Sequence, residues 1–308
     1  LDIFFASFRI PDLVFEILIT GALTTAFIPI FIKYQKDKDE LNEIISSIIN
    51  IASLVLLASM IVLFFSLDVL IPIITPGFTQ EKLKYVIFYS KILLLGQLPF
   101  LFLGNLLTGL GQANKTFIVS ALAPIVYNLA IIVATIFFSS SLYLFGPIMG
   151  VVTGAMLLFA IQIPVLGSTN FTYYLTIKIT KGVREFFHVI LPRVITVIVA
   201  QIDATIDLTL ATLLGSGSYT IFYLAQHLHL LPVSVIGIAF GQASLPYLSE
   251  LYQQKETEKF KQIITESILS ILYLTIPIMS FFIFARTPLV RLFFGGEKFD
   301  RSGTVQTA

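Results

Sequence analysis

The chain contains no cysteine and only three histidines among its 308 residues. Without cysteine it can form no disulfide, no thiolate metal site and no cysteine nucleophile. The histidines are His188, His227 and His229, and they form no HExxH or comparable ligand pattern. The net charge of +1 provides no basic footprint for a nucleic acid. We therefore expect no catalytic site, no metal, no cofactor and no nucleic-acid partner.

Charged residues are also scarce. They make up 12% of the chain, whereas hydrophobic residues make up 56%, and the mean hydropathy is +0.93. A soluble domain usually carries about 25% charged residues. So many apolar side chains cannot all be buried in one water-soluble core, because a folded domain must also cover itself with polar surface. The composition therefore argues against a soluble enzyme.

What the chain does have is long uncharged runs. Thr116 to Ile177 is 62 residues without Asp, Glu, Lys or Arg, Leu208 to Ser249 is 42, and Ile44 to Leu67 is 24. A helix that crosses the hydrocarbon needs about 20 apolar residues, and only helices or closed barrels satisfy the backbone there. We therefore expect an all-α polytopic membrane protein. Gly, Pro and charge divide the runs into eight expected spans, at 12–33, 44–67, 86–109, 117–138, 144–166, 187–213, 219–249 and 263–285. Residues 1–11 are expected to be a loop, with a new helix starting at Pro11.

Basic residues predict the orientation. The loops between the expected spans lie alternately on the two sides of the membrane. The loops of one side carry ten Lys and Arg in total, and those of the other side carry eight. The positive-inside rule places the richer set in the cytoplasm. Lys36 and Lys181 are then expected on the cytoplasmic side, and Lys84 and Arg291 on the other side.

A weak internal repeat suggests two lobes. Arg9-Ile10-Pro11, followed by Gly21 and Ala26 to Pro29, has a counterpart in Leu230 to Pro232, followed by Gly237 and Ala243 to Pro246. Six spans separate the copies, and an even number of spans gives parallel repeats, as in transporters built of two similar lobes. Chance matches of Gly and Pro between apolar helices are the alternative. The chain starts at Leu1 rather than Met, so we expect a piece of a longer protein.

The 187–213 span carries polar residues at membrane depth. They are Arg193, Gln201, Asp203 and Asp207, and the two carboxylates share a helix face because they are four residues apart. Ionisable groups in a membrane usually face a cavity or a partner. One interpretation is a site for substrate, an ion or a proton. The other is a polar contact between helices, with Arg193 at the interface.

Two further sets of polar residues have two interpretations each. The 219–249 span carries four residues at intervals of seven, which therefore share a helix face: Thr220, His227, Ser234 and Gly241. Gln226 lies next to His227 in the sequence. They either line a cavity with a titratable His or belong to a close helix contact at Gly237-xxx-Gly241. Asn128 is either a cavity residue or a hydrogen-bonding residue that holds helices together.

A series of short motifs runs in order along nearly the whole chain. They are residues 2–13 (DIFFASFRIPDL), 21–29 (GALTTAFIP), 75–78 (TPGF), 107–112, 121–129 (ALAPIVYNL), 191–193 with Gln201, Asp203 and Asp207, 215–218, 245–249 and 291–300. No single motif is specific, but together they resemble the MurJ/MviN family of lipid II flippases.

The resemblance implies a fold and a function. Family members have fourteen spans in two lobes around a central cavity, within the multidrug/oligosaccharidyl-lipid/polysaccharide exporter superfamily. The chain would then hold a first lobe at 1–170 without its first helix, a cytoplasmic linker at 171–186, and the start of a second lobe at 187–308. It would move an undecaprenyl-pyrophosphate-linked peptidoglycan precursor outward across the bacterial inner membrane by alternating access, for synthesis of the cell wall that sets cell shape. We expect a monomer among membrane lipids, and the coupling source (Na⁺, H⁺ or membrane potential) stays open.

The resemblance also assigns roles to residues. Arg9 matches a basic position of the family, Asp2 matches its loop Asp, and Asp12 lies in the same stretch. We expect Arg9 to be a main cation for the pyrophosphate, with the dipole of a helix starting at Pro11 to help it. An interfacial Arg that reaches lipid phosphates is the alternative.

The chain departs from the family pattern at three places. Phe15 and Thr20 replace charged residues, and His227 stands where an Arg is common, so that His227 is expected to take over as a cation. These changes keep two other functions open. One is a superfamily exporter of a different lipid-linked saccharide or small molecule, and the other is a membrane scaffold that transports nothing.

Overall fold

The computed structural model describes residues 1–20, 30–31, 33–34, 36–114, 116, 118–169, 171–238, 240–241, 244, 248, 251, 255–295 and 307. The chain divides into two compact units, unit 1 from Leu1 to Ser216 and unit 2 from Gly217 to Ala308. Each unit is described by itself below. The lobe boundaries expected from the sequence stay a prediction.

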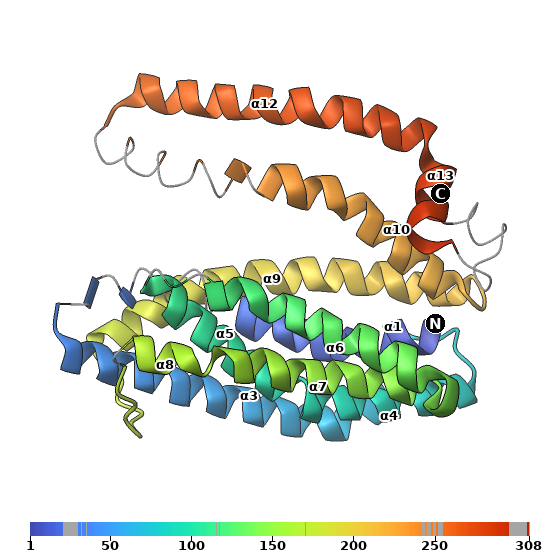
Figure 1. The fold of residues 1–308 in the computed structure, drawn as a ribbon, viewed down its shortest axis with the longest axis horizontal. Coiled ribbons are helices and arrows are strands. Elements are labelled where there is room, and N and C mark those ends of the chain that lie inside the picture. Colours follow the sequence, from blue (N-terminus) through green and yellow to red (C-terminus); the bar gives the residue numbers. More distant parts are fainter. Residues whose placement is uncertain are drawn as a thin grey trace. The chain divides into compact units, whose positions relative to one another are not determined.

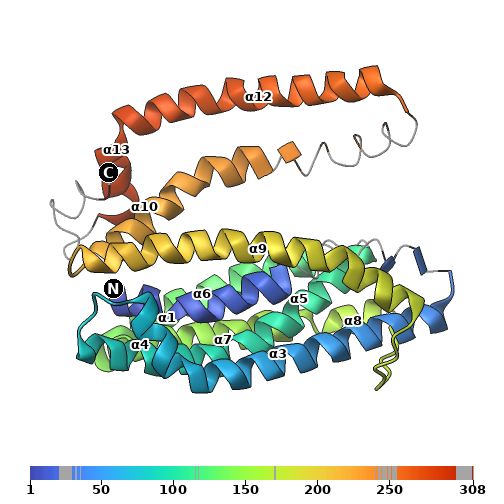
Figure 2. The same cartoon turned by 180° about the vertical axis from the view of Figure 1, so that it is seen from behind.

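Unit 1 is a bundle of long helices that run back and forth along one axis (Figures 1 and 2). Successive spans run in opposite directions, and α4 and α5 follow one another within a single span. The elements are α1 (Asp2–Phe15), the π-helical η1 (Glu16–Thr20), α3 (Lys38–Ile74), α4 (Gln80–Gly96), α5 (Leu98–Ala113), α6 (Ile118–Leu142), α7 (Phe145–Gln162), α8 (Pro164–Ser168) and α9 (Lys181–Leu213).

Seven helical stretches among the described residues are long and apolar enough to cross a membrane. They are Lys38–Ile74, Gln80–Ala113, Ala121–Leu142, Phe145–Ser168, Lys181–Leu213, Ser218–Gly237 and Thr257–Phe284. They coincide with seven of the eight expected spans, so the all-α polytopic architecture is confirmed. Part of the expected span at 12–33, including 21–29, lies outside the described residues, as do parts of 219–249 and of the repeat motifs.

The expectation of a loop before Pro11 is wrong. Helix α1 begins at Asp2 and continues through Pro11. A proline inside a helix has no N–H for the carbonyl four residues earlier, here that of Ser7. The hydroxyl of Ser90 on α4 donates a hydrogen bond of 2.9 Å to this carbonyl, and Ser7 and Ser90 are fully buried. The side chain thus supplies the missing donor, as happens when proline is tolerated in membrane helices.

Small residues bring α6 and α7 together. Gly146, Gly150 and Gly154 lie four residues apart on α7, facing α6. A Cβ atom at Gly150 would lie 2.5 Å from the Cβ of Ala134, and one at Gly154 would lie 2.8 Å from the carbonyl oxygen of Tyr127. Membrane helices often associate through such spacing, because it lets their backbones approach closely.

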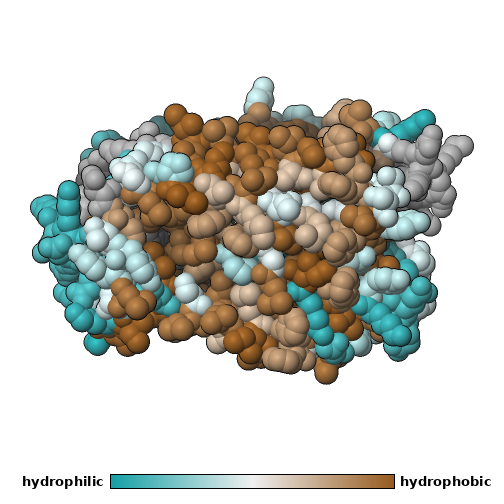
Figure 3. Space-filling model, turned by 60° about the horizontal axis from the view of Figure 1, so that its bottom comes forward, coloured by the Kyte–Doolittle hydropathy of each residue, from teal (hydrophilic) through white to brown (hydrophobic). Residues whose placement is uncertain are grey.

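Polar groups mark the two ends of unit 1. Lys33 pairs with Glu185 at 2.6 Å and Lys178 pairs with Glu43 at 2.5 Å, at the end where α3 and α9 begin. Lys82 lies at the opposite end, where α4 begins. On the face shown in Figure 3, hydrophobic side chains cover the middle and hydrophilic ones gather toward the ends. Unit 1 therefore has the surface pattern of a membrane bundle, although its sidedness stays a prediction.

Unit 2 is smaller. It contains α10 (Ser218–Pro232), the π-helical η2 (Val233–Ile238), α12 (Thr257–Phe284) and α13 (Arg286–Phe294). Helix α10 follows Gly217, whose φ of 94° suits glycine. Helix α12 has no buried residue among those described, and it is apolar along most of its length.

Candidate functional site

Arg9 joins α1 to α9. Its Nη2 donates to the hydroxyl of Thr205 at 2.6 Å, to the carbonyl of Gln201 at 2.7 Å and to the side-chain oxygen of Gln201 at 3.2 Å. Its Nε donates to the Thr205 hydroxyl at 3.1 Å. The side chain is half-buried. Arg9 and Gln201, both expected as cavity residues, are thus brought together, and the expected position of Arg9 before a helix start is wrong because it lies inside α1.

Thr205 belongs to this contact although the sequence analysis did not select it. Its hydroxyl also donates to the Gln201 carbonyl at 2.6 Å, one turn earlier. The signal was its spacing, since Thr205 is four residues from Gln201 and so lies on the same face of α9. A threonine in an apolar helix is too common for that spacing alone to identify it.

A second contact lies near the start of α1. The Nζ of Lys82 on α4 is 3.0 Å from the Asp2 carboxylate and donates to the Ser216 hydroxyl at 2.8 Å. The Asp2 side chain is only 7% exposed, so its charge needs this partner. Lys82 also lies 5.2 Å from the centre of the Phe78 ring. Asp2 was an expected site residue, whereas Lys82 was expected only in a charged loop.

The loop before α4 touches the end of α9. The Gly77 N–H donates to the Thr212 hydroxyl at 3.2 Å. A Cβ atom on Gly77 would lie 1.8 Å from the carbonyl oxygen of Thr212, so only glycine allows this approach. Together, the contacts of Arg9, Lys82 and Gly77 close the seam between α9 and the α1–α4 pair. We call this set of contacts the α9 clasp.

The other candidates on α9 lie away from the clasp. One face of α9 carries the residues that contact other elements: Gln201 and Thr205 face Arg9 of α1, and Thr212 faces the loop before α4. Leu208 lies on the same face by its spacing and is buried. Asp203 and Asp207 lie on roughly the opposite face, at 100° per residue. Both are exposed, as is Arg193, and none of the three forms an ion pair with another described residue. Their orientation toward a central cavity stays a prediction.

Two further candidates in unit 1 have local surroundings. Asp12 is half-buried one turn beyond Arg9 on α1, near enough for the charges of Arg9 and Glu16 to act on it. Asn128 is exposed, and its amide donates to the carbonyl of Pro124 on its own helix at 2.8 Å. Asn128 therefore makes a bond within α6 rather than one across the lobe.

The candidates in unit 2 do not share one environment. Thr220 is buried, Gln226 is half-buried, and His227 and Ser234 are exposed. The His227 ring stacks on Tyr223 at 4.1 Å between ring centres, and its Nδ1 is 2.8 Å from the Tyr223 carbonyl. Ser234 donates to the carbonyl of Leu230 at 3.0 Å. The described part of the chain places no atom within 4 Å of a Cβ at Gly237 or Gly241.

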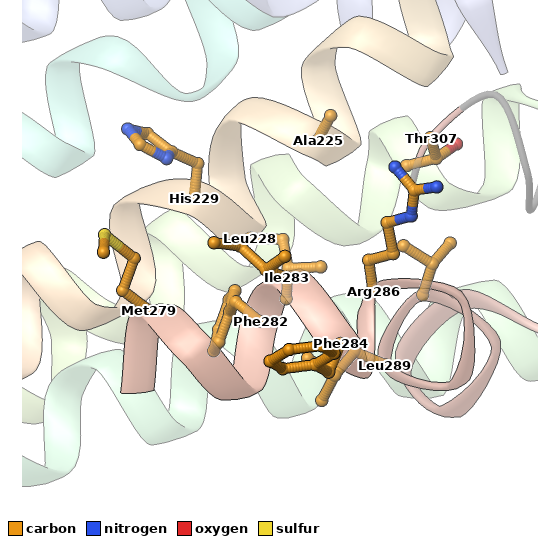
Figure 4. Close-up of a pocket in the computed structure, with 11 residues that line it drawn as sticks. Ala225, Leu228, His229, Met279, Phe282, Ile283, Phe284, Arg286, Leu289 and Thr307 are labelled. Atoms are coloured by element: carbon orange, nitrogen blue, oxygen red, sulfur yellow. The ribbon is translucent and has the colours of Figure 1, made fainter. Parts of the chain in front are cut away.

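Unit 2 also has a pocket that the sequence did not suggest. It measures about 770 Å³ and lies among α10, α12 and α13. Most of its lining is apolar, with Arg286 and Thr307 together at one side and His229 and Met279 at the other (Figure 4). Its chemistry would suit an anionic amphiphile. Among the described residues, no group of three His, Cys, Asp or Glu could hold a metal ion.

Comparison with known proteins places these features in context. The model of one protein family, described as lipid II flippase MurJ, matches residues 1–308. Curated relatives include the probable lipid II flippase MurJ of Buchnera aphidicola subsp. Acyrthosiphon pisum, 27% identical over 318 residues, and the lipid II flippase MurJ of Burkholderia cenocepacia, 23% identical over 309 residues. These alignments cover 100% and 97% of this chain but only 61% and 60% of the relatives.

Solved structures agree with the family match. A lipid II flippase MurJ in an inward closed conformation has a TM-score of 0.79 at 27% identity, covering 99% of this chain and 63% of that one. An inward-facing multidrug transporter of the MATE family, in the MOP superfamily, has a TM-score of 0.67 at 16% identity, covering 99% and 70%. The second likeness concerns the fold alone.

Proposed function

Because the chain belongs to the MurJ family of lipid II flippases, a family of multi-pass bacterial inner-membrane transporters and not of enzymes, we propose that its protein moves lipid II outward during peptidoglycan synthesis. The chain spans about 60% of the length of the curated relatives it matches. The substrate, the coupling and the monomeric state are therefore proposals for the whole protein.

The observation that carries the proposal is the α9 clasp. A flippase that works by alternating access closes one side of its cavity while the other side is open. Arg9, Lys82 and Gly77 close α9 against α1 and α4 toward one end. The positive-inside rule places Lys82 on the outer side. This supports a state closed to the outside.

The clasp also suggests how Arg9 serves the substrate. A pyrophosphate needs charge-assisted hydrogen bonds, and the guanidinium group suits phosphate oxygens. In the observed state at least two nitrogens of Arg9 bond to Gln201 and Thr205. We propose that substrate phosphates replace these partners when α9 separates from α1. Binding then weakens the clasp, which couples substrate recognition to opening.

The remaining candidates complete the proposal. Arg193 and His227 supply further positive charge, with His227 taking the place of the Arg that the family often has. Asp203 and Asp207 take a coupling cation, either Na⁺ or H⁺, because carboxylates at membrane depth need a partner. Neutral residues at Phe15 and Thr20 favour a second candidate, an exporter of a different lipid-linked saccharide or small molecule.

Complementation tests the proposal. The full-length protein should support growth of a strain depleted of its own lipid II flippase. Arg9→Ala should abolish this support, and Arg9→Lys should keep part of it, because Lys retains the charge without the planar fork. Failure of the wild-type protein, despite normal insertion in the membrane, would favour the different-substrate exporter.

A second variant separates the two roles of Arg9. Gln201→Leu with Thr205→Val removes the clasp partners but keeps the cation. If Arg9 binds substrate, this double variant should retain more growth than Arg9→Ala. An equal loss of growth in both variants would show that Arg9 acts only as a structural contact between α1 and α9.

A further inference from the structure

The segment at 171–180 links α8 to α9 in unit 1 and is not helical. We call it the tyrosine arm, after Tyr173 and Tyr174. It turns tightly at Leu175, where the Thr176 N–H donates to the Tyr174 carbonyl at 2.9 Å. Figure 1 shows the arm as a narrow yellow-green ribbon that leaves the bundle near the start of α3, across the direction of the helices, and Figure 2 shows it from behind.

One asparagine fixes the arm to α3. The Asn50 amide donates to the carbonyls of Tyr174 at 3.1 Å and Thr176 at 2.8 Å, and its oxygen accepts from the Tyr173 hydroxyl at 2.6 Å. One turn earlier, the Ser46 hydroxyl accepts from the Tyr174 N–H at 3.0 Å. Both ends of the Asn50 amide are thus used. The arm has a defined position on α3, so its exposed side chains face a defined direction.

The place of these bonds along α3 sets the depth of the arm in the membrane. Asn50 lies six residues into the uncharged run of 24 that begins at Ile44. At about 1.5 Å per residue this run is about 36 Å long, and the hydrocarbon core is about 30 Å thick. Asn50 is about 9 Å from the start of the run, so it lies in the outermost third of the core, next to the headgroup region. The arm leaves α3 sideways at this level, so it lies along the membrane boundary.

The arm exposes aliphatic side chains at that boundary. Leu175 is 91% exposed, Ile177 62% and Ile179 69%. The backbone of the arm is hydrogen-bonded to α3, and these side chains do not pack in the core of unit 1. Tyrosine is enriched at membrane interfaces. Lys181 and Arg184, both exposed at the start of α9, have the charge that attracts anionic headgroups.

We propose that the tyrosine arm is an anchor that inserts Leu175, Ile177 and Ile179 into the boundary of the cytoplasmic leaflet, with Lys181 and Arg184 held by anionic lipid headgroups. The partner is the lipid surface itself. The anchor fixes the start of α9 at one depth, so that the helix can tilt about this point when the α9 clasp opens. This role does not depend on which substrate the protein moves.

The absence of tryptophan from residues 1–308 gives a direct test. Leu175→Trp is introduced into the full-length protein, with any tryptophan beyond residue 308 replaced by Phe, and the protein is placed in liposomes. We expect blue-shifted emission, with stronger quenching by lipids brominated high on the acyl chain than by lipids brominated near its end. Emission as in water, quenched by acrylamide and unaffected by brominated lipids, would overturn the proposal.

Two matched probes calibrate the depth. Leu57→Trp lies near the middle of the uncharged run of α3, and the Leu57 side chain is 54% exposed, so deep bromines should quench it most. Asp39→Trp lies in the first turn of α3 and is exposed, so acrylamide should quench it. If neither acrylamide nor any brominated lipid quenches Trp at 175, the side chain contacts protein instead. This result would also refute the anchor.

Three further variants test the parts of the anchor. Asn50→Leu should release the arm and increase acrylamide quenching of Trp at 175, while quenching of Leu57→Trp in the same background stays unchanged. Ser46→Ala should do the same to a smaller extent if Asn50→Leu does not fold. Anionic lipid should strengthen lipid quenching at 175, and Lys181→Gln with Arg184→Gln should remove this effect. Quenching that is equal in neutral and anionic liposomes would exclude the headgroup contact.

Discussion

The Ser90 hydroxyl on α4 donates a hydrogen bond of 2.9 Å to the carbonyl of Ser7, the acceptor that Pro11 leaves without its usual helical donor. This bond allows α1 to continue through a proline and carries Arg9 to its position opposite α9. A buried carbonyl without a donor costs about 1–3 kcal/mol. The bond therefore matters to the stability of unit 1 and to the geometry of the α9 clasp.

Ser90→Ala should lower the free energy of unfolding by about 1–3 kcal/mol. Thermal unfolding of the full-length protein in detergent measures this. The matched control is Ser66→Ala, because the exposed Ser66 hydroxyl bonds only within its own helix, and it should have little effect.

Replacing the proline itself provides a sharper form of the same test. Pro11→Ala restores an N–H for the Ser7 carbonyl, so Ser90→Ala should cost less in that background than in the wild type. An equal cost in both backgrounds would show that Ser90 stabilises the protein through some contact other than the proline gap.

Gly77→Ala should break the contact between the loop before α4 and the end of α9. The added Cβ would lie 1.8 Å from the Thr212 carbonyl oxygen, and a backbone atom cannot move away cheaply. We expect strongly reduced complementation with normal membrane insertion. Gly167→Ala is the control, since a Cβ there meets no described atom within 4 Å. Wild-type growth of Gly77→Ala would show that this approach is not needed.

Lys82→Ala should loosen the clasp, because it removes the ion pair with the buried Asp2 carboxylate and the hydrogen bond to Ser216. A cysteine at Ala211, a residue that is 4% exposed, reports this opening. An impermeant thiol reagent added from outside should label it faster in Lys82→Ala than in Lys84→Ala, a change at an exposed neighbour. Equal labelling rates in the two variants would show that the Lys82–Asp2 ion pair does not hold the α9 clasp closed.

Single cysteines also test the orientation, because residues 1–308 contain no cysteine. Lys84→Cys should react with an impermeant reagent in intact cells, and Lys36→Cys and Lys181→Cys should react only after the cells are opened. Figure 1 places the starts of α3 and α9 at one end of unit 1 and the start of α4 at the other. Labelling of Lys36→Cys and Lys84→Cys from the same side would contradict the expected topology.

The sequence predicted the architecture because its signals are local. An uncharged run of helix length identifies a span without reference to any other part of the chain, and seven expected spans coincide with the described helices. The start of α1 was missed because Pro11 normally marks a helix start. Its compensating donor, Ser90, lies 83 residues away, and no local pattern reveals such a partner.

The candidate site was predictable in part for the same reason. Gln201 stood out as a polar group in an apolar helix, and Arg9 and Asp2 were selected by the family resemblance, whereas neither signal selected their partners Thr205 and Lys82. A threonine is common in membrane helices, and Lys82 lies in a stretch that is charged as a whole. Contacts that join α1 to α9 across about 190 residues depend on packing, which periodicity does not encode.

Translocation of the lipid itself tests the central claim most directly. Cells depleted of their own flippase and expressing the full-length protein should expose newly made lipid II to an impermeant enzyme added from outside. The wild type should restore this exposure, Arg9→Ala should not, and Gln201→Leu with Thr205→Val should restore more than Arg9→Ala. Lipid II that stays inaccessible in cells with correctly inserted wild-type protein would contradict the account.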